Sequence, residues 1–419
     1  MVSFVIKGGK IVTPDSILET DLLIENGKIA KIGEISSSGK KTIDASGLFI
    51  LPGAIDGHVH FREPEDKSKE DFSTGSASAL SGGVTTVIDM PCYRNPTTST
   101  ISAYSQKQKI AKARCRCDYQ LRFGATESNF LEAKKSNAPS LKIFLTETGS
   151  ELSCSKEAAI NHMKTFPKEK SIVVHAEDAA RIEARKNKFS KHEEIRDKKV
   201  AWLACEFVLK EAAKLNRRIH ICHVTTKLEV QMCRGYEKAT YEINPAHLYL
   251  CADDLRDLGF LGKINPPLRD NKERALLWHA IGDDSIIASD HAPHAVSHKK
   301  AGSPGYPGVG TLLPLMLQAV HEHKLDLKRV SRICSLNPAS AFQLPHKGLI
   351  APGFDADLVF VDMKKKWKIR AKNRMSKCNW TPFEGKEVYG KIEKVFLRGA
   401  LAYDGEKVLA KPGNGKEVL

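Results

Sequence analysis

The feature that most constrains the fold is an alternation of apolar and helical segments that begins near residue 51. Strand candidates include GVTTVIDMP, DYQLRFGAT, LKIFLT, SIVVHAE, RIHICHV, ATYEINPAH and SIIASDHAP, and helical periodicity marks KKVAWLACEFVLKEAAKLN and KERALLWHAIG between them. Strands that alternate with helices form parallel sheets, and about eight such units close into a barrel. The sequence therefore predicts an α/β fold, with a (β/α)8 TIM-like barrel over residues 52–345.

The two ends of the chain have a different pattern. FVIKGGKIV, DLLIENGKIAKIG and KTIDASGLFILPG join short apolar runs to glycine turns near the N-terminus, and DADLVFVD and IEKVFLRGALAYDG resemble them near the C-terminus. We expect residues 1–51 to form an antiparallel β unit. With residues 346–419 it should make one small β-sandwich domain, into which the barrel is inserted.

Composition excludes several classes of protein. At 419 residues and 41% hydrophobic content, the chain can bury one large core. Its ten cysteines are irregularly spaced, without a repeated C-x-x-C, which favours reduced thiols in a cytoplasmic protein. Uncharged apolar runs of about 18 residues, the length that spans a membrane, do not occur.

The formal charge of +15 raises the question of nucleic-acid binding. The charges are diffuse, however, and the densest run lies at Lys364, Lys365, Lys366, Lys368 and Arg370. A solvated face or a loop explains this run better than a nucleic-acid site. A basic surface would also attract an anionic small-molecule substrate.

Polar residues with metal-binding chemistry stand at or just beyond the ends of the predicted strands. They are His58, His60, Lys142, His175, His223 and Asp290. In a barrel these strand ends converge on one face, where active sites are built. The spacing of His58 and His60 puts both imidazoles on one side of a strand. Two imidazole pairs and a carboxylate would form a two-metal site, and such ligands favour zinc.

Lys142 is unusual because it lies inside the apolar segment LKIFL, where an unpaired ammonium is costly to bury. One interpretation is a lysine whose ammonium reaches water at a strand end. The other is an amine that has reacted with carbon dioxide to give a carbamate, which can bridge two cations. The residues alone leave both interpretations open.

Taken in order, a set of motifs resembles the amidohydrolase superfamily and, more narrowly, the dihydroorotases, including the dihydroorotase domain of the animal multifunctional pyrimidine protein. The motifs are PGAIDGHVHFREP, GGVTTVIDMP, LKIFLTETGSEL, VVHAE, HICHV, EINPAHLYL, INPPLR, ASDHAPH, LNPASAF and GFDADLVFVD. The resemblance implies a zinc-dependent cyclic amide hydrolase. Such an enzyme interconverts N-carbamoyl-L-aspartate and L-dihydroorotate in pyrimidine (UMP) biosynthesis.

By the same resemblance, two Zn²⁺ ions share an N6-carboxylated Lys142. The first is held by His58, His60, Lys142 and Asp290, and the second by Lys142, His175 and His223. A hydroxide bridges the ions, and Asp290 is the general acid and base. Cys222 and Glu242 match positions that hold an additional zinc in some relatives, although a buried thiol beside a ligand strand is the commoner arrangement.

Substrate selection is expected to rest on other residues. Arg62, two positions after His60, should point the same way along the strand and bind a carboxylate through two hydrogen bonds. The resemblance adds Asn265, His294, Pro304, Gly305 and, on a substrate-covering loop, Thr148. One departure stands out, because Cys92 replaces an asparagine that binds the substrate carboxylate. Either Asn95 or Arg94 takes over this contact, or the contact is lost.

Three alternatives remain beside this hypothesis. An allantoinase or a hydantoinase would share the metal ligands, but Arg62 and the NPPLR and DHAPH segments favour an acidic substrate. A non-catalytic relative that serves as a partner protein would lack ligands, and here the set is complete. A nucleic-acid-binding protein rests on charge alone. Relatives also suggest a homo-oligomer or an association with aspartate carbamoyltransferase.

Overall fold

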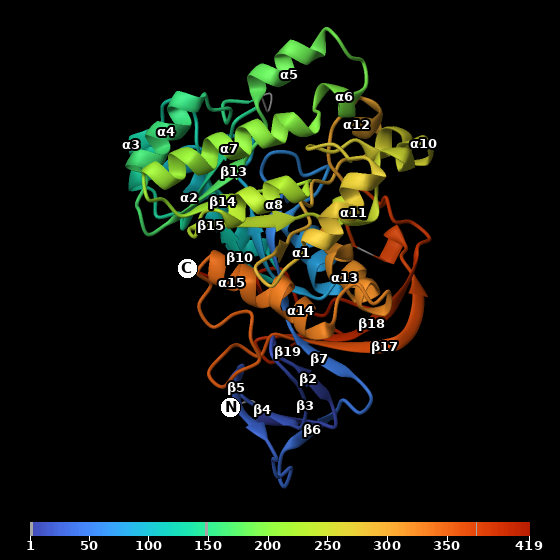
Figure 1. Ribbon diagram of the computed structural model, residues 1–419. Helices are drawn as coiled ribbons and strands as arrows, with labels where there is room; N and C mark the ends of the chain where they lie inside the picture. Colours follow the sequence, from blue (N-terminus) through green and yellow to red (C-terminus); the bar gives the residue numbers. More distant parts are fainter. Residues whose placement is uncertain (1–2, 147–149, 374) are drawn as a thin grey trace.

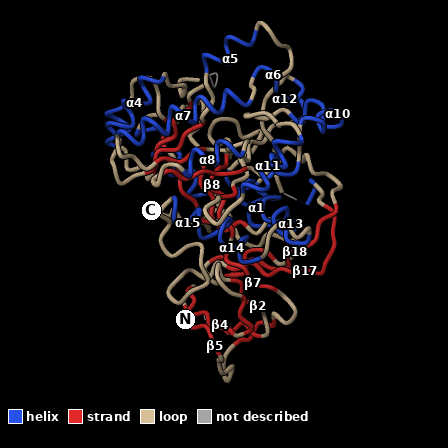
Figure 2. The backbone as a smooth tube through the Cα atoms, viewed as in Figure 1, coloured by secondary structure: helices blue, strands red, loops and turns tan. Residues whose placement is uncertain are grey.

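The computed structural model describes residues 3–146, 150–373 and 375–419. Figures 1 and 2 show strands from the middle of the chain surrounded by helices. Strands from the N-terminal segment form the end of the molecule opposite α5 (Ala179–Lys186) and α6 (His192–Ile195). Within the described residues, no helix is both long and apolar enough to cross a membrane.

The middle of the chain forms two parallel sheets. One holds β8 (Ala54–Val59), β9 (Val84–Asp89) and β10 (Asp118–Leu121). The other holds β11 (Phe123–Gly124), β12 (Ser140–Phe144), β13 (Ser171–His175), β14 (Ile219–Ile221), β15 (Ala239–Ile243) and β16 (Ile286–Ile287). Neighbouring strands are parallel, which confirms the predicted α/β class.

The chain itself joins these sheets at one edge, and a backbone bridge joins them at the other. Only Arg122 separates β10 from β11, and His291, shortly after β16, forms a parallel bridge with Val59 of β8. The strands β8, β9, β12 and β13 are buried along their whole length. Near-continuous apolar strands of this kind are typical of parallel sheets covered by helices.

Helices connect most of the parallel strands. They include α1 (Phe72–Ser81), α2 (Ile101–Arg114), α4 (Lys156–Thr165), α7 (Lys198–Lys214), α8 (Lys227–Arg234) and α11 (Asn271–Ala280). Each begins at a side chain that accepts a hydrogen bond from the backbone N–H three residues on, namely Asp71, Thr100, Ser155, Asp197, Thr226 and Asp270. The helices predicted from periodicity, α7 and α11, are confirmed.

The two ends of the chain form two further sheets. The first has the order β5 (Lys28–Gly33), β4 (Asp21–Glu25), β1 (Ser3–Lys7), β6 (Lys41–Asp44). The second has the order β19 (Ala400–Tyr403), β18 (Glu387–Leu397), β17 (Leu358–Lys368), β7 (Phe49–Pro52), β2 (Lys10–Val12), β3 (Ile17–Glu19). Segments from both ends of the chain therefore share a sheet.

The expectation of purely antiparallel pairing is wrong at two places. The pairs β1–β6 and β2–β7 are parallel. The reason is that the chain crosses from the first sheet to the second twice in the same sense, from β1 to β2 and from β6 to β7. Between the sheets lies one apolar cluster, which includes Phe4, Ile24, Ile29, Ile11, Ile50, Leu358 and Phe396.

The basic run near residue 366 lies on the exposed half of strand β17. Lys366 and Lys365 pair with Glu387 and Glu393 of the neighbouring strand β18, with N–O distances of 2.6 and 3.0 Å. The predicted solvated face is therefore confirmed, and the alternative of a loop is wrong. All ten cysteines are buried and free.

A buried lysine connects the parallel strands to the terminal sheets. The Lys347 ammonium is 3% exposed and lies 2.5 Å from Asp118 at the start of β10. It also lies 2.9 Å from Asp355 and 2.7 Å from Asp357, just before β17. Although burial acts in the opposite direction, Asp357 and Asp118 raise the pKa of Lys347. The lysine is therefore a fixed cation that joins segments far apart in sequence.

Replacement of Lys347 by Met would remove the cation shared by two buried carboxylates, Asp118 and Asp357, and by the partly buried Asp355. We expect the free energy of unfolding to fall by about 3–5 kcal/mol, because removing one partner of a buried ion pair leaves uncompensated charge. Lys10→Met is the matched control. It breaks an exposed pair with Glu19 and should cost about 0–1 kcal/mol in the same denaturant titration. Equal losses in the two variants would contradict the structural role of Lys347.

Candidate active site

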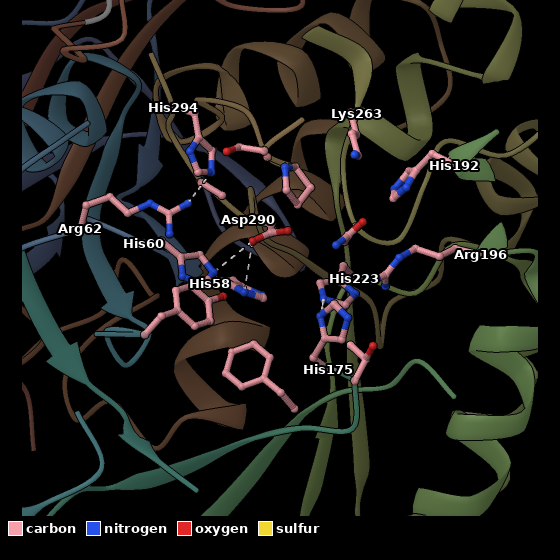
Figure 3. Close-up of a pocket in the computed structure, with 18 of the residues that line it drawn as sticks. His58, His60, Arg62, His175, His192, Arg196, His223, Lys263, Asp290 and His294 are labelled. Carbon is pink, nitrogen blue, oxygen red and sulfur yellow. Dashed lines mark hydrogen bonds and ion pairs between the residues drawn. The ribbon is translucent and has the colours of Figure 1, made fainter. Parts of the chain in front are cut away.

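A cavity of about 500 Å³ opens at the carboxyl ends of the parallel strands (Figure 3). Its lining includes ten of the residues singled out from the sequence, namely His58, His60, Arg62, His175, His223, Asn265, Asp290, His294, Pro304 and Gly305. Residues more than 200 positions apart thus share one site, since parallel strands end on the same side.

At one side of the cavity, two imidazoles converge on a carboxylate. Asp290 Oδ1 lies 3.2 Å from His58 Nε2 and 3.4 Å from His60 Nε2, as the dashed lines in Figure 3 mark. His58 belongs to β8 and His60 follows it, whereas Asp290 comes after β16 with a φ of 47°. This left-handed backbone is rare outside glycine and turns the carboxylate toward the imidazoles.

Asp56 fixes the two strand ends that carry these ligands. Its carboxylate is fully buried and accepts hydrogen bonds from the backbone N–H of His58 at 3.2 Å and of Ser289 at 3.0 Å. The Ser289 hydroxyl also donates to it. Burial raises the pKa of Asp56 to about 7, against the effect of these bonds. The β8 end and the Asp290 turn are therefore held in register.

At the other side of the cavity lie His175 and His223, at the ends of β13 and β14. His175 Nε2 donates to Glu177 at 2.8 Å, and Glu177 also forms a buried ion pair with Arg196. Despite burial, Arg196 and His175 lower the pKa of Glu177 to about 2. With its proton on Nε2, His175 presents Nδ1 as a lone pair, which lies 2.8 Å from His223 Nε2.

The cluster has the properties of a metal-binding site. Burial lowers the pKa of His58 to about 3 and holds the pKa of His60, His175 and His223 below the usual range, so all four imidazoles are neutral near pH 7. Neutral imidazole nitrogens and a carboxylate are the usual ligands of zinc and related cations. The rings of His58 and His223 are 5.6 Å apart, which joins the two sides into one cluster.

Lys142 is fully buried but does not line the cavity. Its Nζ lies 2.8 Å from the Cys222 sulfur and 4.8 Å from the centre of the Phe144 ring. None of the described residues forms an ion pair with it. Cys222, Glu242 and His58 are also close enough together to hold a cation. Glu242 already accepts hydrogen bonds from His58 Nδ1 and from His220 Nε2, the latter at 3.0 Å.

The substrate side of the cavity carries unpaired polar atoms. Arg62 donates to His294 Nε2 at 3.1 Å (Figure 3), which places the proton of this imidazole on Nδ1. Arg62 Nε, His294 Nδ1 and Asn265 Oδ1 are all buried without a hydrogen-bond partner. Buried polar groups of this kind are costly unless a ligand satisfies them.

Arg62 reaches the cavity by a different route from the one expected. Strand β8 ends at Val59, and Arg62 lies beyond it with a φ of 60°, so alternation along a strand does not set its direction. Asp89, at the end of β9, accepts a hydrogen bond from the backbone N–H of Phe61 at 2.8 Å. The turn itself, held by this bond, directs the guanidinium inward.

Another buried lysine, Lys299, holds the outer wall of the cavity. Lys299 Nζ donates to the backbone oxygens of Lys263 at 2.6 Å and Gly305 at 2.8 Å. Trp380 donates to the backbone oxygen of His294 at 2.7 Å. Burial, with the nearby Lys263 charge, lowers the pKa of Lys299 to about 7. These contacts bring the segments of Asn265, His294 and Gly305 together.

Cys92, at the position where an asparagine was expected, and its neighbours Arg94 and Asn95 lie in different environments. Cys92 is buried with its sulfur 3.4 Å from the backbone oxygen of Glu63, and Asn95 is exposed; neither lines the cavity. Arg94 lines it and is exposed. Thr148 lies outside the described residues.

Several lining or supporting residues were not identified from the sequence. Glu177 follows His175 by two positions in VVHAED, and an acid so close to a ligand was the available signal. Arg196 lies far in sequence from any of the predicted site residues, and Lys263, although two positions before Asn265, was not singled out. Tyr93, which lines the cavity next to Cys92, also gave none.

Glu177→Gln should weaken metal binding about 10- to 100-fold, because the amide cannot hold His175 as firmly in the Nε2-protonated form. The measurement is competition for zinc between the protein and a chelator of known affinity. Glu273→Gln is the control, since Glu273 is another buried glutamate that pairs with Lys198 outside the cavity. Zinc affinity unchanged in Glu177→Gln would exclude this role.

Comparisons with known proteins complete the description. Residues 49–402 match the amidohydrolase family. A dihydroorotase of Methanosarcina acetivorans is 36% identical over 98% of this chain and 94% of its own length. The multifunctional protein CAD of Squalus acanthias is 37% identical over 88% of this chain, a match that spans 16% of that protein. Among solved structures, an L-hydantoinase (dihydropyrimidinase) of Arthrobacter aurescens matches with a TM-score of 0.94 and 28% identity, and both chains are covered completely.

The family match covers most of the chain, including the strands that carry the imidazole cluster. The dihydroorotase of Methanosarcina acetivorans extends this match over nearly the full length of the chain. The chain belongs to the amidohydrolase family and, within it, to the dihydroorotases.

Proposed function

We propose that the chain is a metal-dependent cyclic amide hydrolase that interconverts L-dihydroorotate and N-carbamoyl-L-aspartate, a step of pyrimidine (UMP) biosynthesis. One observation carries the proposal. The side chains of Arg62 and His294, which carry the unpaired donors Nε and Nδ1, line the same cavity as the His58, His60 and Asp290 cluster. The cavity can therefore bind the anionic group of a small molecule and hydrolyse another part of the same molecule.

The unpaired atoms support an acidic cyclic amide as the substrate. A carboxylate accepts hydrogen bonds from Arg62 and His294, and the Asn265 oxygen can accept from a ring N–H. Dihydroorotate supplies both groups. Uncharged hydantoins would leave the Arg62 and His294 donors buried without a partner, which costs binding energy.

The reaction needs an activated water and a proton carrier. Divalent ions held by the imidazole cluster would polarise the ring carbonyl and lower the pKa of a bound water. Burial and the Glu242 charge raise the pKa of Asp290, whereas a divalent ion bound beside it would favour the ionised form that can accept a proton. In ring opening, Asp290 takes the proton of the attacking water and delivers it to the departing ring nitrogen. In ring closure the transfers run in reverse.

The proposal includes two Zn²⁺ ions and a carboxylated Lys142. The support for carboxylation is physical, since an ammonium buried without an ion-pair partner is unfavourable whereas a carbamate beside two cations is not. His58, His60 and Asp290 would hold one ion, and His175 and His223 the other, with Lys142 between them.

The finer architecture is also part of the proposal. We infer that β8 to β16, with β10 and β11 as one interrupted strand, close into a (β/α)8 barrel. The bridge between Val59 and His291 supports this closure. Residues 52–345 would form the barrel domain, and residues 1–51 and 346–419 the β-sandwich. The similarity to a domain of the CAD protein motivates a test for association with aspartate carbamoyltransferase and for homo-oligomers.

A hydantoinase activity is the second candidate, because a solved L-hydantoinase matches this fold over its full length. Purified protein should be assayed for ring opening of dihydroorotate, hydantoin and allantoin, with zinc content determined on the same sample. Turnover of dihydroorotate alone supports the first proposal. A zinc-loaded protein that opens only the neutral rings would replace it with the second.

Asp290→Ala should lower kcat for dihydroorotate by about 100- to 10,000-fold, because the variant loses its proton carrier. Part of the zinc should remain bound, since four imidazoles are unchanged. Turnover and zinc content measured together check this expectation, and a kcat near that of the wild type would remove Asp290 from its proposed role.

Arg62→Met should raise KM for dihydroorotate about 10- to 100-fold, the effect of losing a hydrogen bond between charged groups. A neutral cyclic imide should be affected far less. Lys186→Met is the control, because Lys186 also lines the cavity but is exposed and pairs with Glu183. Equal losses on charged and neutral substrates would show that Arg62 does not bind the carboxylate.

A further inference from the structure

Tyr93 lines the cavity, and the proposed reaction does not yet use it. Its ring lies nearly parallel to that of His60, with centroids 5.7 Å apart and an angle of 13°. The Arg62 guanidinium lies 6.0 Å from the ring centre, and the Phe144 ring lies 5.6 Å away. Tyr93 therefore contacts both the imidazole cluster and the side of the cavity that carries Arg62 and His294 (Figure 3 shows these labelled neighbours).

Tyr93 is half-buried, and its hydroxyl differs from those of several other tyrosines of this chain. Hydroxyls of Tyr104, Tyr236, Tyr241, Tyr249 and Tyr306 each bond to a protein atom. None of the described residues forms a hydrogen bond with the Tyr93 hydroxyl, although its side chain is part of the cavity lining. A phenol hydroxyl can donate a hydrogen bond to an anionic group of a ligand.

The backbone keeps Tyr93 in this position. Its N–H donates to the Glu65 carboxylate at 2.9 Å, and the N–H of the preceding Cys92 donates to the Thr98 hydroxyl at 3.0 Å. The Cys92 sulfur is turned toward the backbone oxygen of Glu63. At this turn, Tyr93 and Arg94 line the cavity, whereas Cys92, at the position where an asparagine was expected, does not.

We propose that Tyr93 is a specificity-determining residue, whose hydroxyl donates to the substrate carboxylate beside Arg62 and His294 and whose ring supports His60. The inference rests on the proposed function, because it assigns a third donor to the same anion. It adds Tyr93 to Arg94, which also lines the cavity, as a residue that could compensate for Cys92. A ring that served packing alone would not need the hydroxyl, and this difference makes the proposal testable.

The test is Tyr93→Phe in the full-length, zinc-loaded protein, which removes one oxygen and keeps the ring. We expect KM for dihydroorotate to rise about tenfold, the effect of one lost hydrogen bond to a charged group. The kcat and the zinc content should stay within about twofold of wild type, because His60 keeps its stacked neighbour. Tyr236→Phe is the matched control, since it removes a hydroxyl outside the cavity, and its KM should be unchanged.

The outcomes separate the inference from the proposed function. Wild-type protein that does not open dihydroorotate overturns the function itself. Wild-type protein that opens it, together with a Tyr93→Phe variant of unchanged KM, overturns only the role of Tyr93. If the Phe variant cannot be purified, Tyr93→Gln and Tyr93→Leu replace it. A lower KM for Gln than for Leu supports a donor at this position, and equal values overturn it.

Discussion

The structure depends on the parallel pairing of short, fully buried strands. Because these strands run in the same direction, polar residues placed just after them gather at one end and lose contact with water. Burial then acts oppositely on the two kinds of group, as it lowers the pKa of His58 and raises that of Asp290. Both shifts favour the neutral form of each group, which leaves lone pairs free on the imidazoles and makes a cation beside Asp290 favourable, since it would stabilise the ionised carboxylate.

The cavity combines two kinds of construction. The imidazoles of His58 and His175 are fixed by the strands that carry them and by the buried carboxylates of Glu242 and Glu177. Arg62, Asn265 and His294 lie instead on turns and loops, which are held by backbone hydrogen bonds and by Lys299. Loops change more readily than buried strands do. A likeness of fold to hydantoinases is therefore compatible with a different substrate.

Much of this arrangement could be predicted from the sequence, because periodicity identifies strands and helices and because ligands follow strand ends. The residues that escaped prediction depend on contacts between distant segments. Arg196 meets Glu177 only after α6 folds over the cavity, and nothing in the sequence pairs them. The direction of Arg62 follows from a left-handed turn that period-two alternation does not describe. Likewise, the parallel pairing of β1 with β6 follows from how the chain crosses between sheets.

The contacts of Lys347 also set an order of events during protein synthesis. Asp118, at the start of a central strand, faces Lys347 and Arg398, and its carboxylate also accepts a hydrogen bond from the backbone of Lys416. On the ribosome, that acid emerges hundreds of residues before its partners. Because an unpaired carboxylate is costly to bury, the Asp118 side chain stays hydrated until Lys347 and Arg398 have been synthesised. The full set of contacts at the start of β10 therefore forms only after residue 416 has emerged, long after the strand itself has been made.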